Sequence, residues 1–428
     1  MHSPLLDESI SDRIFATYHI ETAHPLEQAA AIMAGEQSAG TFVKVPGETP
    51  ELLEQHGARV ERITELDSTD VPALPGSRPP KGSPAPRYQR AEVVLSFPFA
   101  NIGTSLTACM TAVSGNLYEL SPFSGLRLLD VEFPPAFIAA HPGPAFGVEG
   151  TRRLTGVRSG PMLGTIIKPS VGLSPTQTAA LVQTLCDAGL DFIKDDELQS
   201  NAPHSPLTER VQAVMGVINA FAERTGKRVM YAFNVTGDLD TIKRGHDTVL
   251  AHGGTCIMVN LIPVGLTAVE WLRRNSQLPI HGHRAGWGAL SRHLSLGWEY
   301  RAFQKFFRLA GVDHLHVNGL RNKFCESDES VMTAARACLT PMAGGYTALP
   351  VFSSGQWAGQ APDTYAALGS TDLLYLAGGG IMAHPDGPAA GVASLREAWD
   401  AALSGISLDE YARTHPALRG ALEMYGAL

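Results

Sequence analysis

From about residue 160 onward, short apolar runs alternate with stretches in which apolar residues recur at helical spacing. Eight runs follow this pattern, and most end in polar residues or glycine: "MLGTIIKP" (162–169), "DFIKDDE" (191–197), "VMYAFNVTG" (229–237), "CIMVNLIPVG" (256–265), "IHGHRAG" (280–286), "HLHVNG" (314–319), "LPVFSSG" (349–355) and "LLYLAGGG" (373–380). Continuous apolar runs separated by helices are typical of parallel strands buried on both faces. Eight such units in about 250 residues predict a closed (β/α)8 TIM barrel.

The first 140 residues follow a different pattern. It predicts five strands and two helices, with the strands at 13–22, 41–45, 58–66, 91–99 and 126–134 and the helices at 24–36 and 105–115. A β-α-β-β-α-β order is typical of a ferredoxin-like α+β domain. The Pro-rich stretch 71–87 lies between two predicted strands, so we interpret it as an exposed loop of that domain. The chain is therefore predicted to have two domains, 1–140 and 141–428, with the barrel carrying the site.

Two of the predicted barrel helices carry clear end signals. Ser174 and Thr176 can cap the helix that follows them, and Gly189 marks its end. A second amphipathic stretch, 205–227, also ends close to a glycine.

The composition limits the classes of function. The 428 residues are 44% hydrophobic and 18% charged, as expected of a globular protein with large buried surfaces. The formal net charge of −9, with no basic cluster, disfavours nucleic acid as a partner. The five cysteines lie far apart without a CxxC pair, which favours reduced thiols over disulfides or a zinc site. Without an apolar leader at the start or a membrane-length apolar run, we expect a cytoplasmic protein.

The stretch "LDFIKDDELQSN" (190–201) is difficult to explain by packing, because an apolar run leads directly into Lys194, Asp195, Asp196 and Glu197. Strand alternation places Lys194 and Asp196 on one face and Asp195 on the other. Two carboxylates beside an ammonium group make a poor cation site. If the lysine captured CO2 as a carbamate, three anionic groups would converge and suit Mg²⁺. The alternative is a lysine that simply forms ion pairs at a strand end.

Polar residues gather at the predicted carboxyl ends of the other strands, where the active site of a TIM barrel lies. They are Lys168, Asn234, His281, His283, Arg284, His316, Asn318, Lys323, Ser353, Ser354, Gly355, Gly378, Gly379 and Gly380. Some allow a structural interpretation, because His281 fits a core histidine and the three glycines fit a tight turn.

Seven motifs occur in an order that resembles the large subunit of ribulose bisphosphate carboxylase and, more closely, its RuBisCO-like relatives. They are "GEQSAGTF", "SGNLYEL", "GTIIKPSVGLSP", "LDFIKDDE", "HGHRAG", "HLHVNG" and "LAGGGIMAHPDGP", and together they span nearly the whole chain. The resemblance implies a carbamylated Lys194 that binds Mg²⁺ together with Asp196 and Glu197. It implies that Lys168 moves protons and that His283 contacts substrate hydroxyls. Asn234 would support the metal site, and Lys323 would lie on a mobile loop over the substrate.

The resemblance also implies two phosphate sites and a homodimer or an assembly of dimers. Arg284, His316 and Ser353 match one phosphate site, whereas Gly355, Gly379, Gly380 and Thr41 match the other. Backbone N–H groups of a Gly-rich loop can hold a phosphate, which agrees with the second set. Glu36, Thr41 and Asn116 match residues that reach the active site of a neighbouring subunit.

Four departures from the carboxylase pattern put bisphosphate carboxylation in doubt. Ser170 replaces the second lysine of a Lys-Pro-Lys run, and Trp287 stands where the carboxylase has a histidine. The loop before Lys323 reads "NGLRN" in place of a Gly-Thr-rich run, and Ser354 replaces a glycine. The metal-site residues and Lys168 are retained.

These features predict a Mg²⁺-dependent carbon–carbon lyase that acts through an enediolate on a phosphorylated sugar acid. The expected reaction is decarboxylation of 3-oxo-isoapionate 4-phosphate to L-erythrulose 1-phosphate and CO2. Hydrolytic or transcarboxylase cleavage of the same compound, or isomerisation of another ketose phosphate, are the alternatives. A binuclear amidohydrolase is disfavoured because its HxH pair belongs on the first strand, whereas "HGH" is on the fifth. A non-catalytic binding protein is disfavoured because no metal ligand is lost.

Overall fold

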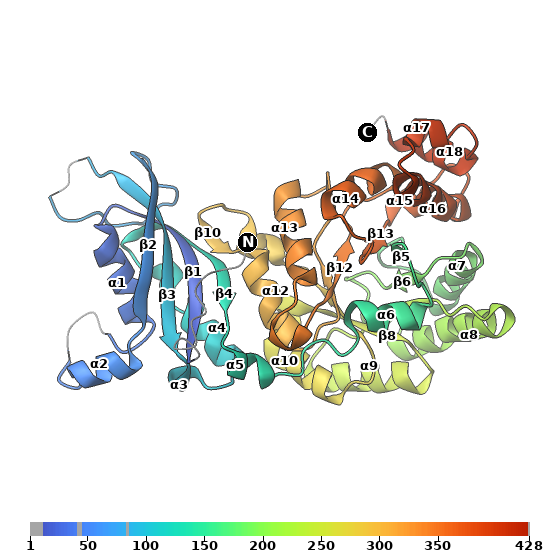
Figure 1. Ribbon diagram of the computed structural model, residues 1–428. Helices are drawn as coiled ribbons and strands as arrows, with labels where there is room; N and C mark the ends of the chain where they lie inside the picture. Colours follow the sequence, from blue (N-terminus) through green and yellow to red (C-terminus); the bar gives the residue numbers. More distant parts are fainter. Residues whose placement is uncertain (1–11, 41–44, 83–84, 427–428) are drawn as a thin grey trace. The chain divides into compact units, whose positions relative to one another are not determined.

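The computed structural model describes residues 12–40, 45–82 and 85–426 (Figure 1). The chain divides into two compact units. The first contains Met1–His141 together with Gly286–Leu309, and the second contains Pro142–Ala285 and Ala310–Leu428. The first junction lies one residue from the boundary predicted at 140. The sequence did not indicate that Gly286–Leu309 leaves the barrel and packs with the N-terminal residues.

The first unit is built on a five-stranded sheet in the order β10-β4-β1-β3-β2. Each hydrogen-bonded pair among β1 to β4 is antiparallel, and the order β4-β1-β3-β2 is that of the predicted ferredoxin-like domain. Its elements are β1 (Arg13–Thr22), α1 (Leu26–Glu36), α2 (Pro50–His56), β2 (Arg59–Thr69), β3 (Tyr88–Pro98), α3 (Phe99–Ile102), α4 (Leu106–Ser114), the 3-10 helix η2 (Leu117–Glu119), β4 (Phe123–Glu132), α5 (Pro135–Ala139), α11 (Trp287–Ser291), β10 (Leu296–Trp298) and α12 (Tyr300–Leu309). The strand predicted at 41–45 falls mostly on 41–44, outside the described residues. The stretch 71–87 is the connection between β2 and β3, as predicted.

Strand β10 was not predicted, because it has only three residues and depends on one long-range partner. It pairs with β4 in parallel, from Leu296 opposite Leu126 to Trp298 opposite Leu128. Arg127, a buried residue of β4, fixes this loop by donating to three main-chain oxygens and to the carboxylate of Glu299. A hydrophobic pattern along the chain does not show such a contact between residues 164 or more positions apart.

The second unit is a closed eight-stranded parallel barrel, as predicted (Figure 1). All eight predicted runs contribute one strand each: β5 (Met162–Ile166), β6 (Phe192–Lys194), β7 (Met230–Asn234), β8 (Cys256–Asn260), β9 (Ile280–His283), β11 (His314–His316), β12 (Leu349–Phe352) and β13 (Leu374–Leu376). The interior is packed by buried apolar side chains such as Phe192, Met230 and Leu376. This packing makes the barrel a solid support for the polar residues at its strand ends.

The described part of the second unit contains these helices, for two of which the sequence carried end signals. They are α6 (Gly147–Thr155), α7 (Pro175–Asp187), α8 (Leu207–Thr225), α9 (Leu239–Ala251), α10 (Leu261–Asn275), α13 (Asp328–Leu339), η3 (Ala343–Gly345), η4 (Ala358–Gln360), α14 (Ala361–Leu368), α15 (Gly379–Met382), α16 (Pro388–Ser404), α17 (Leu408–Tyr411) and α18 (Pro416–Tyr425). Ser174 caps α7 in a reciprocal box with Gln177, whereas Thr176 lies inside the helix. Gly226 ends α8 at φ 75°, a conformation that favours glycine. No helix among the described residues is both long and apolar enough to cross a membrane.

Candidate active site

The end of β6 separates its charged residues onto two faces. Asp195 is buried and points away from the barrel interior to Arg210 of α8, which binds its carboxylate through Nε and Nη2 at 3.2–3.3 Å. The same carboxylate accepts from the hydroxyl of Tyr231 at 2.6 Å and from the backbone N–H of Asn234 at 2.9 Å. Asp195 is therefore a structural anchor between β6, β7 and α8, on the opposite face from Asp196.

Lys194, Asp196 and Glu197 come together at the carboxyl end of β6. The Nζ of Lys194 lies 3.5 Å from Oε2 of Glu197 and donates to the backbone oxygen of Asp195 at 2.8 Å. Asp196 is buried and accepts at Oδ2 from Nζ of Lys168, at 2.7 Å. Lys168 also donates to Oγ of Ser170 at 2.8 Å, and its side chain is 37% exposed. Two lysines and two carboxylates therefore meet at one point, and one of the lysines can be reached from solvent.

His283 extends this cluster from β9. Its Nε2 lies 3.5 Å from Oε2 of Glu197, and its Nδ1 accepts from the backbone N–H of Ala285 at 3.2 Å. A neutral imidazole that accepts at Nδ1 carries its proton on Nε2, so His283 offers a donor toward Glu197. Burial, followed by the charge of Lys194, lowers the pKa of His283 to about 3.

Glu197 is ionised at neutral pH. Burial by itself would raise its pKa, but His283 and Lys194 outweigh burial and the pKa falls to about 2. Since His283 is neutral above about pH 3, its charge cannot act on Glu197 near pH 7. The ammonium group of Lys194 lies beside the carboxylate at 3.5 Å, and the charge of Lys168 also lowers the pKa of Glu197.

The donor set fits a hard cation only if Lys194 changes its charge. Among the described residues, no three His, Cys, Asp or Glu side chains are grouped so as to hold a metal ion. Burial lowers the pKa of Lys194, although Glu197 and Asp196 partly oppose this, and a lower pKa favours the neutral amine that can react with CO2. A carbamate there would add a third oxygen donor to Asp196 and Glu197, the oxygen-rich set that Mg²⁺ prefers.

Two asparagines at adjacent strand ends hold the main chain of this cluster. Nδ2 of Asn234 donates to the backbone oxygens of Asp196 and Glu197, each at 3.1 Å. Nδ2 of Asn260 donates to the same oxygen of Glu197 at 2.9 Å, whereas its buried Oδ1 has no partner among the described residues. The sequence analysis named Asn234 but missed Asn260, which ends β8 as Asn234 ends β7. That repeated position was the available signal.

A second polar cluster joins the ends of β9, β11 and β12. His316 Nδ1 lies 3.0 Å from Oγ of Ser353, and Oγ of Ser354 donates to Oδ1 of Asn318 at 2.7 Å. Asn318 (φ 64°) and Ser354 (φ 71°) adopt the left-handed conformation, which is uncommon outside glycine. The rings of His283 and His316 are 4.5 Å apart, so this cluster adjoins the first.

Arg284 binds a carboxylate in this second cluster. Its Nη2 pairs with Oε2 of Glu326, which also accepts from Nδ2 of Asn318 at 2.7 Å. The sequence analysis missed Glu326, because it lies in an irregular loop with no periodic signal. An arginine that pairs with one carboxylate can bind another anion in its place.

Lys323 and the glycine-rich turns border the same strand ends. The backbone N–H of Lys323 donates to the oxygen of Ser354 at 3.1 Å, and the Lys323 ammonium lies 5.3 Å from the ring of Phe324. Gly355 has φ 91°, a conformation that side chains rarely adopt. A Cβ on Gly378 would lie 3.6 Å from Cε of Lys168, which brings the turn after β13 next to the first cluster.

The two predicted phosphate-binding glycines of this turn differ in their surroundings. A Cβ on Gly380 would lie 2.6 Å from the backbone oxygen of Gln356 and 2.7 Å from Cβ of Trp357, so close packing by itself accounts for that glycine. A Cβ on Gly379 would meet nothing within 4 Å.

The predicted residues of the first unit form a separate pair. Glu36, the last residue of α1, accepts at Oε1 from Nδ2 of Asn116 at 3.2 Å, and both side chains are exposed. Thr41 lies outside the described residues. Trp287 is 5% exposed and packs edge-on against Tyr300, so it serves as core in the first unit.

Three histidines line the barrel interior, and one of them, His316, belongs to the second cluster. His281, His314 and His316 are at most 3% exposed, and His281 lies in hydrogen-bonding distance of each of the other two. Burial lowers the pKa of His314 to about 3 and holds the pKa values of His281 and His316 well below the ordinary range. All three are therefore neutral near pH 7, as the structural interpretation of His281 requires.

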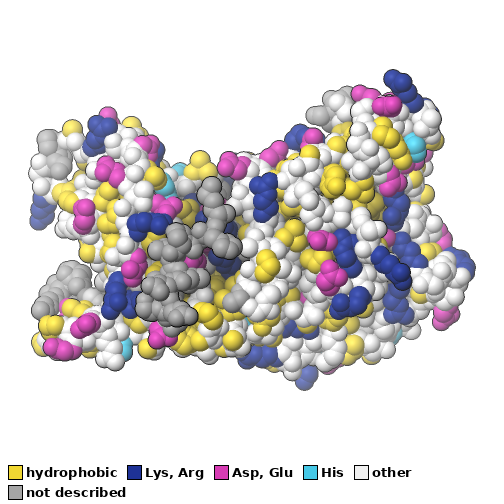
Figure 2. Space-filling view, in the orientation of Figure 1, with side chains coloured by type: hydrophobic (Ala, Val, Ile, Leu, Met, Phe, Trp, Pro, Cys, Tyr) yellow, Lys and Arg dark blue, Asp and Glu magenta, His cyan; other side chains and the backbone are white. Residues whose placement is uncertain are grey.

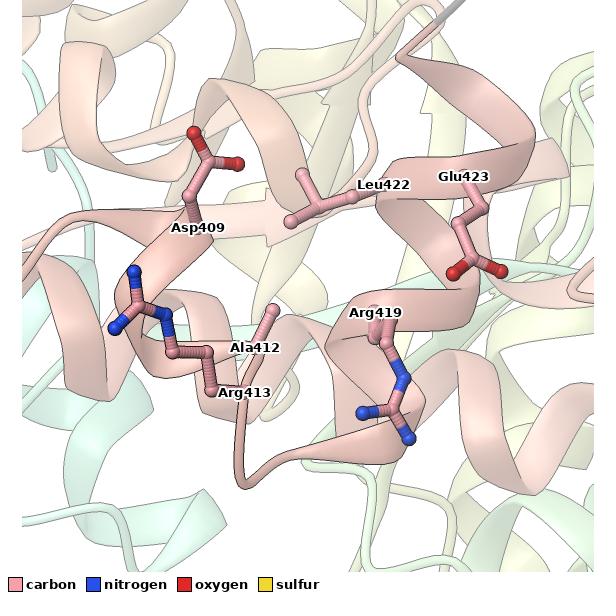
Figure 3. A pocket seen from close by; sticks show the side chains of 6 residues that line it. All are labelled: Asp409, Ala412, Arg413, Arg419, Leu422 and Glu423. Carbon is pink, nitrogen blue, oxygen red and sulfur yellow. The ribbon is translucent and has the colours of Figure 1, made fainter.

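Other surface features lie away from these residues. On the face shown in Figure 2, acidic and basic side chains are interspersed. Figure 3 shows a hollow at the C-terminal helices α17 and α18, lined by Asp409, Ala412, Arg413, Arg419, Leu422 and Glu423. None of the predicted site residues borders it, so the barrel strand ends remain the candidate site.

Comparison with known families agrees with this arrangement. The model of the ribulose bisphosphate carboxylase large chain catalytic domain matches residues 147–425, and the model of its N-terminal domain matches residues 7–76. The chain belongs to this family. The predicted resemblance to the large subunit of ribulose bisphosphate carboxylase is thereby confirmed, and individual relatives confirm the resemblance to its RuBisCO-like members.

Individual RuBisCO-like relatives match over almost their full length. A 3-oxo-isoapionate-4-phosphate transcarboxylase/hydrolase from Xanthobacter autotrophicus is 55% identical over 96% of this chain and 99% of its own. A 3-oxo-isoapionate-4-phosphate decarboxylase from Rhizobium etli is 46% identical over 96% of this chain and 98% of its own. The crystal structure of a rubisco-like protein from Burkholderia fungorum is 46% identical, covers 97% of this chain and 100% of its own, and superimposes with a TM-score of 0.90.

Proposed function

We propose that this RuBisCO-like protein cleaves a carbon–carbon bond of 3-oxo-isoapionate 4-phosphate by transcarboxylation or hydrolysis. The observation that carries the proposal is its 55% identity, over nearly complete lengths, to a transcarboxylase/hydrolase of that compound. Decarboxylation, the reaction expected from the sequence, is the second candidate, supported by 46% identity to a decarboxylase. The higher identity favours the reaction that the sequence analysis had placed second.

The geometry supplies a proton donor and a hydrogen-bond donor for such a cleavage. Lys168 is partly exposed and is oriented by Asp196 and Ser170, so it can deliver a proton to the carbon from which a bond departs. His283 is neutral and carries its proton on Nε2, which suits it to donate to a substrate oxygen rather than to repel a cation. Arg284 can bind the substrate phosphate by exchanging it for the carboxylate of Glu326.

The residues that would hold Mg²⁺ are the carbamylated Lys194, Asp196 and Glu197. When bound there, Mg²⁺ would polarise a substrate carbonyl beside the bond that breaks. Asn234 and Asn260 keep the backbone of Glu197 in place for this role. We further propose that Glu36 and Asn116, which already share a hydrogen bond, complete the site of a neighbouring subunit, with Thr41. The assembly would then be a homodimer or a multiple of it.

Product analysis tests the proposed reaction directly. The enzyme, incubated with Mg²⁺ and bicarbonate, is given 3-oxo-isoapionate 4-phosphate in water enriched in ¹⁸O. Hydrolysis keeps all of the carbon in two acids and places one heavy oxygen in a new carboxylate, with no gas evolved. Decarboxylation releases one CO2 for each molecule consumed and yields L-erythrulose 1-phosphate.

The outcomes separate the two candidates and the substrate assignment. Release of one CO2 for each substrate molecule would show that the reaction is decarboxylation and not cleavage to two acids. Unchanged substrate, with enzyme that is folded and loaded with Mg²⁺, would refute the substrate. Ribulose bisphosphate with labelled CO2 serves as the negative control, because Ser170 and Trp287 replace groups of the carboxylase pattern.

A further inference from the structure

A continuous hydrogen-bonded chain of side chains runs through the barrel from α6 to the end of β12. Six groups take part, in this order: the backbone oxygen of Gly147, then Thr151, His314, His281, His316 and Ser353. The successive distances are 2.5, 2.8, 3.3, 2.7 and 3.0 Å. All five side chains are buried, and the last of them lies in the second polar cluster of the candidate site.

The end of this hydrogen-bond chain at Gly147 fixes the direction of every hydrogen bond in it. The backbone oxygen of Gly147 has no proton, so it can only accept. The hydroxyl of Thr151 must therefore donate its single proton to that oxygen, at 2.5 Å. Thr151 can then only accept from His314, whose Nε2 lies 2.8 Å away and must carry the ring proton. A neutral imidazole has one donor and one acceptor, so Nδ1 of His314 is an acceptor.

The rule of one donor and one acceptor applies in turn to the rings of His281 and His316. His281 must donate from Nδ1 to His314 and therefore accepts at Nε2. His316 must donate from Nε2 to His281 and therefore accepts at Nδ1. The partner of that nitrogen is Ser353, whose hydroxyl proton is used on His316, at 3.0 Å. Ser353 consequently presents only lone pairs to anything else that meets it.

The chain cannot conduct protons, because it ends on a buried main-chain carbonyl that neither releases nor takes up a proton. Its effect is to hold a pattern of donors and acceptors. The neighbour of Ser353 does not alter the pattern, because Ser354 donates its own proton to Asn318 at 2.7 Å.

We propose that Thr151 is a positioning residue that, through the three histidines, fixes Ser353 as a hydrogen-bond acceptor at the barrel rim. The ligand group that meets Ser353 must then bring its own proton, as a hydroxyl or a protonated phosphate oxygen does and a phosphate dianion does not. The ligand half of this inference rests on the proposed function, which places the substrate at this cluster. The polarity of Ser353 rests on the hydrogen bonds alone.

Replacing Thr151 by valine should reverse the donor and acceptor roles along the hydrogen-bond chain, although Thr151 lies at the end opposite to Ser353. Valine keeps the shape but removes the acceptor, so His314 would move its proton to Nδ1 rather than bury an unpaired donor. His281 and His316 must follow, Nδ1 of His316 becomes a donor, and the hydroxyl of Ser353 is released toward the rim. Thr151→Ser keeps the hydroxyl and is the matched control.

Neutron diffraction or ¹⁵N NMR of histidine-labelled protein measures the result without substrate turnover. We expect an unprotonated Nδ1 of His316 in the wild type and Thr151→Ser, and a protonated one in Thr151→Val. At pH 8, where a phosphate monoester is a dianion, methyl phosphate should bind Thr151→Val about tenfold more tightly than either of the others.

A protonated Nδ1 of His316 in the neutral wild-type protein would overturn the inference, even if the valine variant did not fold. An unprotonated Nδ1 in a folded Thr151→Val protein would also overturn it. A reversed tautomer with unchanged affinity for methyl phosphate would uphold the polarity of Ser353. It would show that phosphate binds elsewhere, which counts against the phosphate placement in the proposed function.

Discussion

Asp195 and Asp196 are adjacent in sequence and both buried, yet they have opposite surroundings. The carboxylate of Asp195 has a guanidinium, a phenol and a backbone N–H as partners, all inside the fold. The side chain of Asp196 has one ammonium partner, Lys168, which is itself 37% exposed and can exchange it for a ligand. The other oxygen of Asp196, Oδ1, accepts from the backbone N–H of Leu198 at 3.1 Å. A carboxylate whose partners all lie inside the fold stabilises the fold, whereas one whose ammonium partner can be reached from solvent is available for chemistry.

The largest effect is expected at Lys194, which lies on the same face of β6 as Asp196. Lys194→Ala should lower turnover by roughly 10³-fold or more, because the third oxygen donor of the proposed metal site would be lost. Folding should be retained, because Lys194, although fully buried, makes polar contacts at the strand end with Glu197 and the backbone of Asp195. Steady-state rates with Mg²⁺ and bicarbonate, together with urea unfolding, measure the two effects.

Lys227→Ala is the control for that variant. It removes an ion pair with Asp191 at the opposite end of the same strand, where the nitrogen–oxygen distance is 2.7 Å. We expect near-normal turnover. Near-normal turnover in Lys194→Ala as well would refute the carbamate assignment.

Two isosteric substitutions separate the neighbouring carboxylates. Asp195→Asn leaves the buried Arg210 without its counter-charge, so the free energy of unfolding should fall by about 3 kcal/mol. Asp196→Asn should change it by no more than about 1 kcal/mol, because Lys168 can be solvated, but should abolish turnover. Denaturant unfolding and product assays on both variants give the four values. Equal stability losses would remove the distinction between the two faces of β6.

The neutral histidines of the barrel interior should make the stability of the fold depend on pH. Their role, like that of Asp195, is structural rather than catalytic. Below about pH 6.5 the unfolded chain protonates His314, whereas the folded chain does so only near pH 3. Protons therefore favour the unfolded state, and stability should fall as the pH drops through this window. The expected contribution of His314 is about 1.4 kcal/mol per pH unit.

Urea unfolding at pH 7, 6 and 5 measures that slope. His314→Gln should reduce the slope of stability against pH by the contribution of one titrating group. An identical slope in the variant would exclude His314 as a contributor.

The last test extends the comparison to Glu36, an exposed carboxylate with one amide partner, and it measures a partial recovery of activity. Glu36→Gln should be inactive by itself. Mixed in equal amounts with Lys194→Ala, it should recover about a quarter of wild-type activity. Half of the dimers would be mixed, and each of these would contain one intact site. No recovery after subunit exchange, demonstrated by mass spectrometry, would argue against a shared site.

The sequence predicted the barrel well because its signal is local. Each of the eight apolar runs can be recognised from its own residues, although the strands pair with partners that are distant in sequence. Ser174 caps α7 through a neighbour three positions away. The strand β10 was missed because it has only three residues and is held by the distant strand β4, through backbone pairing and through Arg127.

The site was partly predictable for a related reason. Lys194, Asp196 and His283 lie at strand ends, and parallel strands bring those ends together. The pairing of Arg284 with Glu326 depends on the path of an irregular loop, which no periodicity encodes. Strand alternation predicted that Asp195 and Asp196 point to opposite faces. The partners that distinguish them come from α8, β7 and the loop that follows β5.

The passage of Gly286–Leu309 into the first unit limits how this protein can be divided and recombined. The backbone crosses between the units at 141/142, 285/286 and 309/310, so the barrel is not one uninterrupted piece of the gene. An exchange of residues 1–141 between relatives would give β10 a foreign partner strand, since it pairs with β4 and is held by Arg127. Functional chimaeras should require the two segments to be transferred together, which makes them a single unit of inheritance.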